Sequence, residues 1–232
     1  MIPHLDEKPA FVQRLFNRIA KRYDALNNII SLGMHWSWKR YAVNALDLKP
    51  SHHALDVCTG TGDLIGLMRP LVGELGQVTG LDFSPEMLAV AQNRFQGDER
   101  IHLVQGDAMN LPFEENIFEA SIISFGLRNV ANVKQTLQEM RRCTKTGGMI
   151  VNLDTAPMAS VPCFSWYFKW IMPRFGEWFA GDKEAYQYLQ ASTAQFESPE
   201  SLVALFEEIG LVEVHSVRFG LGSVACIVGK KI

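Results

Sequence analysis

The sequence lacks three features that would each point to a particular class of protein. Its four cysteines are far apart and form no CxxC pair, which argues against a zinc site or a disulfide framework and favours a reducing, cytosolic setting: Cys58, Cys143, Cys163 and Cys226. No apolar run approaches the ~18–20 residues of a membrane-spanning helix, and the first residues show no signal-peptide pattern. The 22 Lys and Arg against 25 Asp and Glu give none of the basic surplus typical of nucleic-acid-binding proteins. We therefore expect a cytoplasmic protein without a nucleic-acid partner.

What is present indicates one globular α/β domain over residues 1–232, with 47% hydrophobic and 20% charged residues. Strand and helix patterns alternate through the middle of the chain, as in a parallel sheet with helices on both faces. The expected strands are 53–58, 77–81, 101–105, 119–124 and 149–153, and the expected helices are 63–71, 85–95 and 133–143. A helix then opens at 198–200 and closes at Gly210, and two β-rich runs follow, 212–219 and 223–228. We predict a doubly wound, mostly parallel, seven-stranded sheet with an antiparallel C-terminal pair at one edge.

Two segments lie outside this alternation. Residues 8–40 are expected to be helical, because Phe11, Leu15, Ile19 and Tyr23 recur at i+4 on one face, and we interpret them as a lid. Residues 156–190 are rich in aromatic side chains. They are interpreted either as a helical lid with an apolar channel, resting on a membrane through its tryptophans, or as a pair of core helices. A peripheral membrane contact and a homodimer both stay open.

A glycine-rich turn closes the first expected strand. Residues 55–63 read LDVCTGTGD, an apolar strand running through Thr59, Gly60, Thr61 and Gly62 into a helix, which is how α/β sheets form a ligand crevice. The dinucleotide fingerprint G-x-G-x-x-G would need a third glycine where the chain has Ile65, and no phosphate-loop Gly-Lys-Ser/Thr follows. A ligand without a pyrophosphate is therefore favoured, and S-adenosyl-L-methionine is the common one.

Acidic residues follow the next strands at spacings that suit this cofactor. Asp82 ends the second strand, twenty residues after Gly62, where a carboxylate can accept hydrogen bonds from both ribose hydroxyls. Asp107 follows the third strand and can accept from the adenine amino group. Asp56, near the end of the first strand, is expected to orient either the glycine turn or the amino-acid end of the cofactor. The fold class then corresponds to the class I methyltransferases.

Five short stretches resemble the ubiquinone/menaquinone biosynthesis C-methyltransferases over nearly the whole chain. They are residues 16–24 (FNRIAKRYD), 32–40 (LGMHWSWKR), 124–130 (SFGLRNV), 171–173 (IMP) and 186–192 (YQYLQAS). The resemblance implies a polyprenylated demethyl-naphthoquinol or benzoquinol as the substrate, and we favour the naphthoquinol. It also implies cofactor contacts by Thr61, Asp82, Asp107, Ala108 and Ser124. The complete set of candidate cofactor-binding residues is Asp56, Thr59, Gly60, Thr61, Gly62, Asp82, Phe83, Asp107, Ala108 and Ser124.

Two stretches depart from that family's pattern. Where the family has a Glu followed by Ser or Lys after the fifth strand, this chain reads NLDTAP at 152–157, and the usual His of the last strand is missing from VACIVG at 224–229. These departures keep two alternatives open. One is a methyltransferase for another lipophilic acceptor, such as a benzoquinol, a phospholipid amine, a sterol or a secondary metabolite. The other is a cofactor-binding scaffold of a quinone-synthesis assembly that has lost turnover.

Methylation of an aromatic carbon defines what the catalytic residues must do. A phenol titrates near pH 10, so the site has to stabilise the phenolate or remove its proton. We expect Arg128 to stabilise the anion, directly or through a water that Asn129 orients. Tyr23 is interpreted either as a hydrogen-bond partner of a quinol oxygen or as a core aromatic, and Asp154 as a base or an orienting group. His35 is weighed as a base against a packing role, and no metal is expected.

Overall fold

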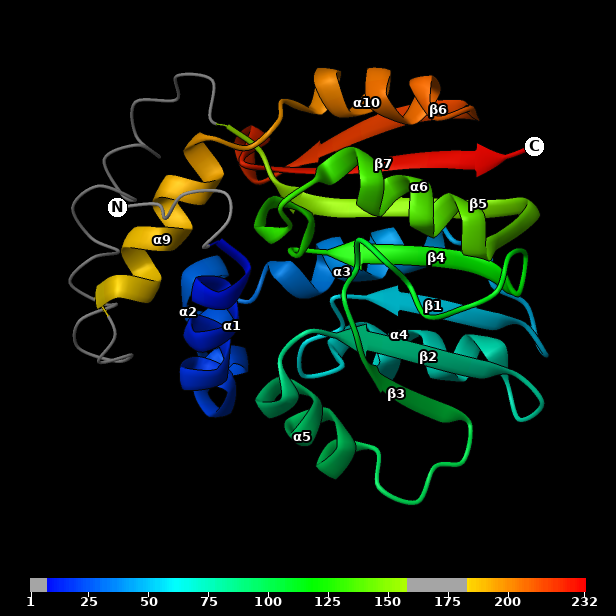
Figure 1. The fold of residues 1–232 in the computed structure, drawn as a ribbon, viewed down its shortest axis with the longest axis horizontal. Coiled ribbons are helices and arrows are strands. Elements are labelled where there is room, and N and C mark those ends of the chain that lie inside the picture. Colours follow the sequence, from blue (N-terminus) through cyan, green and yellow to red (C-terminus); the bar gives the residue numbers. More distant parts are fainter. Residues whose placement is uncertain (1–7, 158–182) are drawn as a thin grey trace.

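The computed structural model describes residues 8–157 and 183–232, and its centre is a seven-stranded sheet in the order β3-β2-β1-β4-β5-β7-β6 (Figure 1). The strands are β1 (His53–Val57), β2 (Gln77–Asp82), β3 (Ile101–Gln105), β4 (Phe118–Ser124), β5 (Thr144–Thr155), β6 (Leu211–Phe219) and β7 (Val224–Lys231). The first five run parallel, whereas β7 pairs antiparallel with both β5 and β6. The predicted mostly parallel sheet with an antiparallel C-terminal pair is confirmed.

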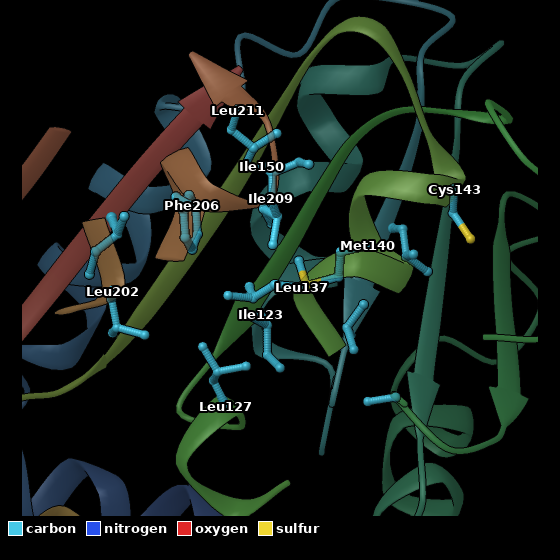
Figure 2. Close-up of a cluster of buried hydrophobic side chains, with 14 of the residues drawn as sticks. Ile123, Leu127, Leu137, Met140, Cys143, Ile150, Leu202, Phe206, Ile209 and Leu211 are labelled. Atoms are coloured by element: carbon cyan, nitrogen blue, oxygen red, sulfur yellow. The ribbon is translucent and has the colours of Figure 1, made fainter. Parts of the chain in front are cut away.

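Helices cover both faces of the sheet. On one face lie α3 (His35–Asn44) and α4 (Asp63–Val72), and on the other lie α6 (Val133–Cys143) and α10 (Pro199–Glu208), while α5 (Pro85–Arg94) connects β2 to β3 (Figure 1). Figure 2 shows the core under α6 and α10, where Leu137 and Phe206 meet Ile123 and Ile150 from the sheet. Both α5 and α6 begin at polar caps, with Ser84 and Asn132 accepting hydrogen bonds from the backbone of the first turn.

The fifth strand is longer than predicted. Its expected bounds were 149–153, yet β5 begins at Thr144, before the KTGG stretch at 145–148, and Thr144 pairs with Phe118 ahead of a register shift in the β4–β5 pairing. Glycine makes this possible. Gly147 has a φ of +85°, and a side chain on Gly148 would meet the carbonyl oxygen of Glu119 at 2.5 Å. The two glycines therefore allow an irregular start of β5, at which the strand bends without leaving the sheet.

The N-terminal segment is helical, as expected, but it is divided into separate helices. These are α1 (Lys8–Ile19), a 3₁₀ turn η1 (Ala20–Arg22) and α2 (Tyr23–Ser31), followed by α3. Together with α9 (Lys183–Ala194), α1 and α2 lie beside the end of the sheet to which the arrows of β1 and β4 point (Figure 1). Residues 158–182, which hold most of the aromatic stretch, lie outside the described residues. Within the described part of the chain, no helix is long and apolar enough to cross a membrane.

Candidate active site

The glycine turn after β1 is held in a backbone conformation that few residues tolerate. Gly60 and Gly62 have φ of +57° and +84°, in the left-handed region, and Gly62 is the residue from which α4 starts. A side chain at Gly62 would meet the ring of Phe95 at 2.6 Å. The turn therefore needs glycine at position 62 for two separate reasons, backbone angle and space.

The carboxylate of Asp82 joins the turns after β1 and β2. Its Oδ2 accepts from the backbone N–H of Gly60 at 2.8 Å, and its Oδ1 accepts from the N–H of Ser84 at 2.8 Å. Burial raises the pKa of this carboxyl, and the backbone donors oppose that rise. Each carboxylate oxygen can accept a second hydrogen bond. Asp82 can therefore serve a ligand while it keeps the two turns together.

A cavity of about 810 Å³, its open mouth included, lies along the carboxyl ends of β1 to β4. Six of the ten residues expected around the cofactor line it: Gly60, Asp82, Phe83, Asp107, Ala108 and Ser124. The other four are not among the lining residues: Asp56, Thr59, Thr61 and Gly62. The ends of four neighbouring strands thus meet at one place, as expected for ligand sites in doubly wound sheets.

The candidate residues that do not line the cavity form hydrogen bonds that hold the glycine turn in place. Thr59 donates a hydrogen bond to Asp56 Oδ2 at 2.6 Å, and Thr61 donates to Asp24 Oδ1 of α2 at 2.6 Å. Asp56 is almost fully buried, and burial raises its pKa to about 7 even though the Thr59 hydroxyl opposes the shift. Of the two roles expected for Asp56, this geometry fits the orientation of the glycine turn.

Helix α1 covers the cavity and is tied to its rim by polar contacts. Lys8 Nζ donates to two backbone carbonyls of the 128–130 loop at 3.1 and 2.8 Å, and Gln13 Nε2 donates to the carbonyl of Phe83 at 2.9 Å. Asn17 Oδ1 accepts from the hydroxyl that caps α5 at 2.6 Å. Sequence reasoning found the helix but missed these contacts, because a backbone carbonyl leaves no signature in the sequence.

Arg128 is buried and ion-paired. Its Nη1 lies 2.5 Å from Asp154 Oδ1 and 2.7 Å from the carbonyl of Phe125, and its backbone N–H donates to Asp154 Oδ2 at 3.2 Å. Arg128 was expected to face the crevice, but it is not among the cavity-lining residues, and Asp154 largely compensates its charge. Asp154 is therefore placed as an orienting group for Arg128.

Asn129 and Tyr23 both line the cavity. The amide nitrogen of Asn129 donates to the carbonyl of Phe125 at 3.2 Å, whereas its Oδ1 is buried without a partner. Burial raises the pKa of Tyr23, whose hydroxyl bonds with Asn27 and whose ring packs edge-on against Phe16. Tyr23 thus packs within the N-terminal helices and also borders the cavity, a position compatible with both interpretations left open for it.

His35 lies apart from the cavity lining. It is buried, its Nδ1 lies 2.6 Å from the Ser31 hydroxyl, and burial lowers its pKa. Nearby, Lys39 and Arg94 both bind the Asp63 carboxylate at 2.7 Å, at the first turn of α4. This arrangement fits the packing role of His35 better than that of a base.

Two residues near the cavity were not singled out as candidates. Cys58 lines it with a φ of +57°, and burial holds the pKa of its thiol well above the usual range. Tyr188 of α9 is not among the cavity-lining residues; it is buried, packs against Phe11 with ring centres 5.4 Å apart, and its hydroxyl has no partner among the described residues. The stretch 186–192 was noted as a family-like motif, which was the available signal for Tyr188.

Comparison with known proteins extends these observations. The sequence model of the ubiE/COQ5 methyltransferase family matches residues 4–231. The chain is 44% identical over 224 residues to the demethylmenaquinone methyltransferases of Staphylococcus aureus strains JH9 and Newman, covering 95% of this chain and 92% of theirs. Among solved structures, the methyltransferase bound to the Haloferax volcanii Trm112 activator has a TM-score of 0.70 at 18% identity, over 93% of this chain and 96% of that one. A SAM-dependent methyltransferase from Thermotoga maritima has a TM-score of 0.66 at 19% identity, over 95% and 99%.

Proposed function

The chain belongs to the ubiE/COQ5 methyltransferase family and is an S-adenosyl-L-methionine-dependent enzyme, and on this premise we propose that it methylates a ring carbon of demethylmenaquinol to give menaquinol. The observation that carries the proposal is the 44% identity to demethylmenaquinone methyltransferases, which spans 95% of the chain. The match therefore includes α1, α2 and α9 on the acceptor side. Solved structures below 20% identity share the fold alone.

The cavity fits S-adenosyl-L-methionine. Asp82 offers free acceptor positions for the ribose hydroxyls, and Asp107 offers a carboxylate after β3 for the adenine amino group. The buried Ser124 Oγ lines the cavity and has no partner, so it is available to a ligand. When bound, the cofactor supplies a methyl group that leaves a cationic sulfur, with both bond electrons returning to the sulfur.

The acceptor gives up one proton for each methyl group that it gains. Ionisation of a ring hydroxyl moves electron density to the ortho carbon, where the new carbon–carbon bond forms. The hydrogen on that carbon then leaves to restore aromaticity, and the ring oxygen is reprotonated. We assign Asn129 the placement of the ring hydroxyl before it ionises, because its Oδ1, which has no partner among the described residues, borders the cavity and can accept the hydrogen bond of that hydroxyl. Arg128 holds the 125–129 loop in place and supplies a positive field that Asp154 tempers. Helix α1 excludes water from this reaction.

We also propose that the enzyme works in the cytoplasm and meets its prenylated acceptor at a membrane surface. Leu32 and Leu221 are 71% and 73% exposed, and both have φ near +50°, a costly conformation for a leucine. The turn that holds Leu221 lies beside α3, because a side chain at Gly220 would touch Trp38, and Leu32 lies in the turn that precedes the same helix. In a vesicle flotation assay, replacing both leucines by serine should reduce binding. Leu75→Ser, at the opposite end of the sheet, should leave binding unchanged. Equal flotation of all variants would contradict this placement.

A methyl-transfer assay tests the proposed reaction. The enzyme receives labelled S-adenosyl-L-methionine and reduced, short-chain demethylmenaquinol, and parallel reactions contain a demethylated benzoquinol or a phospholipid amine. We expect a ring-methylated naphthoquinol by mass spectrometry. Cofactor binding by calorimetry without that product would refute the acceptor. Asn129→Ala should lower turnover and preserve cofactor binding, and it is a cleaner variant than Arg128→Ala because it leaves the buried ion pair intact.

A further inference from the structure

Four buried polar atoms on the acceptor side of the site have no hydrogen-bond partner among the described residues. They are Ser124 Oγ, Arg128 Nε, Asn129 Oδ1 and Tyr188 Oη. The first three belong to the end of β4 and the η2 turn (Leu127–Asn129), whereas the fourth comes from α9. Ser124 and Asn129 line the cavity, whereas Arg128 and Tyr188 are not among its lining residues and lie beside it, where α9 contacts η2. Buried polar groups without partners cost free energy, so unpartnered atoms in and beside the cavity point to a ligand that supplies the missing bonds.

Helix α9 holds Tyr188 against this part of the site. The hydroxyl of Thr193 on α9 lies 3.0 Å from that of Thr155 at the end of β5, which fixes the helix beside Asp154. The ring of Tyr188 packs against Phe11 of α1, and only 6% of the residue is exposed. Arg128 and Asp154 both act electrostatically on its hydroxyl. Tyr188 therefore lies where two lid helices meet the buried ion pair.

The chemistry of the acceptor requires a further donor at this position. Because Asp154 compensates the charge of Arg128, the pair offers an anion less stabilisation than a free guanidinium would. Burial raises the pKa of Tyr188 to about 12, so the phenol keeps its proton at any physiological pH. Tyr23 also borders the cavity, but a hydrogen bond from Asn27 already engages its hydroxyl oxygen. The buried hydroxyl of Tyr188, in contrast, has no partner among the described residues.

We propose that Tyr188 is a catalytic residue whose hydroxyl donates a hydrogen bond to the ring oxygen of the acceptor that ionises before methyl transfer. The inference rests on the proposed function, because it takes a phenolic acceptor as given. It assigns to α9 a part in the chemistry, because this helix carries one of the donors to the anion. The hydrogen bond strengthens as charge develops on the oxygen, so it favours the reactive form over the neutral quinol.

The isosteric variant Tyr188→Phe separates this role from a structural one. The Tyr188 hydroxyl has no partner among the residues that the structure describes, so its removal should leave the melting temperature the same or raise it. Turnover of demethylmenaquinol should fall about 10- to 100-fold, the usual effect of losing a hydrogen bond to a charged group. The affinity for S-adenosyl-L-methionine should not change. The matched control is Tyr41→Phe. Tyr41 is a partly exposed tyrosine of α3 that packs against Phe219 of β6, and the variant should behave like the wild type.

The pH–rate profile gives the second measurement. If Tyr188 stabilises the phenolate, its removal shifts the limb that reports acceptor ionisation to higher pH. Among the described residues, the charged groups that act on the Tyr188 hydroxyl are Arg128 on η2 and Asp154 on β5, and the variant leaves both in place. Wild-type turnover and an unshifted limb in Tyr188→Phe would overturn the inference. A clear fall in melting temperature that accounts for the lost activity would overturn it as well. If the wild-type enzyme does not methylate demethylmenaquinol, the proposed function itself fails, which is a distinguishable result.

Discussion

Replacing Asp56 by asparagine should change how the stability of the protein depends on pH. Asp56 is only 1% exposed, its Oδ1 has no partner, and its Oδ2 accepts a single hydrogen bond from Thr59. Burial raises the pKa of this carboxyl from its ordinary value near 3.8 to about 7 in the folded protein. Asparagine has nearly the same shape and can still accept the Thr59 bond, but it carries no charge at any pH.

The sign of the effect follows from proton linkage. Between the unfolded pKa near 3.8 and the folded pKa near 7, Asp56 is ionised in the unfolded chain and protonated in the folded protein. The stability that the protonated form contributes is complete below pH 3.8 and is lost as the pH rises through 7, at about 1.4 kcal/mol per pH unit. The free energy of unfolding of Asp56→Asn minus that of the wild type should therefore grow by roughly 2.5 kcal/mol between pH 5 and 7. Above about pH 8 the difference should level off.

Urea unfolding of both proteins at half-unit pH steps measures this difference. Other titrating groups are common to both proteins and largely cancel in the subtraction. Asp47→Asn is the matched control, because Asp47 has a left-handed φ that asparagine tolerates and its side chain is 77% exposed. That control should show no comparable slope. A flat difference between Asp56→Asn and the wild type from pH 5 to 7 would refute the argument that burial keeps this carboxyl protonated.

Three further predictions concern stability. Asn152 is fully buried and neither atom of its amide has a partner, so Asn152→Leu should leave the melting temperature unchanged or raise it; a loss above about 1 kcal/mol would show that the amide is satisfied. Lys231 donates to three backbone carbonyls at the end of α6, so Lys231→Met should cost about 2–4 kcal/mol in urea unfolding, and a loss below about 0.5 kcal/mol would contradict it. Gly62→Ala should cost at least about 1 kcal/mol more than Gly97→Ala, because both glycines have φ above +80° but only the first would clash with Phe95; equal losses would remove the steric argument.

The sequence predicted most of the sheet because each parallel strand carries its own apolar run and ends at its own turn. Helix α6 was predicted with its observed bounds, since Asn132 caps its start and the amphipathic period is strong. The cofactor edge of the site was predictable for the same reason, because the ends of β1, β2, β3 and β4 meet at one edge of the sheet. Where a strand ends in the sequence therefore indicates directly where its last residues lie in the site.

The acceptor side was less predictable, because its contacts join residues that the sequence separates widely. Arg128 and Asp154 meet because β4 and β5 are neighbours with Ser124 opposite Leu153, yet the sequence alone shows neither the pairing register nor the path of the loop. Arg128, which was expected to stabilise the anion, is consequently ion-paired with Asp154. Lys8 contacts backbone carbonyls of the 128–130 loop, and every residue type carries such a carbonyl, so the sequence gives no sign of these contacts.

The position of β7 between β5 and β6 has a consequence for the order in which the sheet can be assembled. In the growing chain β6 is synthesised before β7, yet in the folded sheet β6 pairs only with β7. While the ribosome is still adding the residues after 219, β5 presents an open edge and β6 has no strand to join. An emerging chain therefore carries two unpaired strand edges until its last strand enters between them. The sequence of this region must therefore limit aggregation through these open edges during synthesis, in addition to stabilising the folded protein.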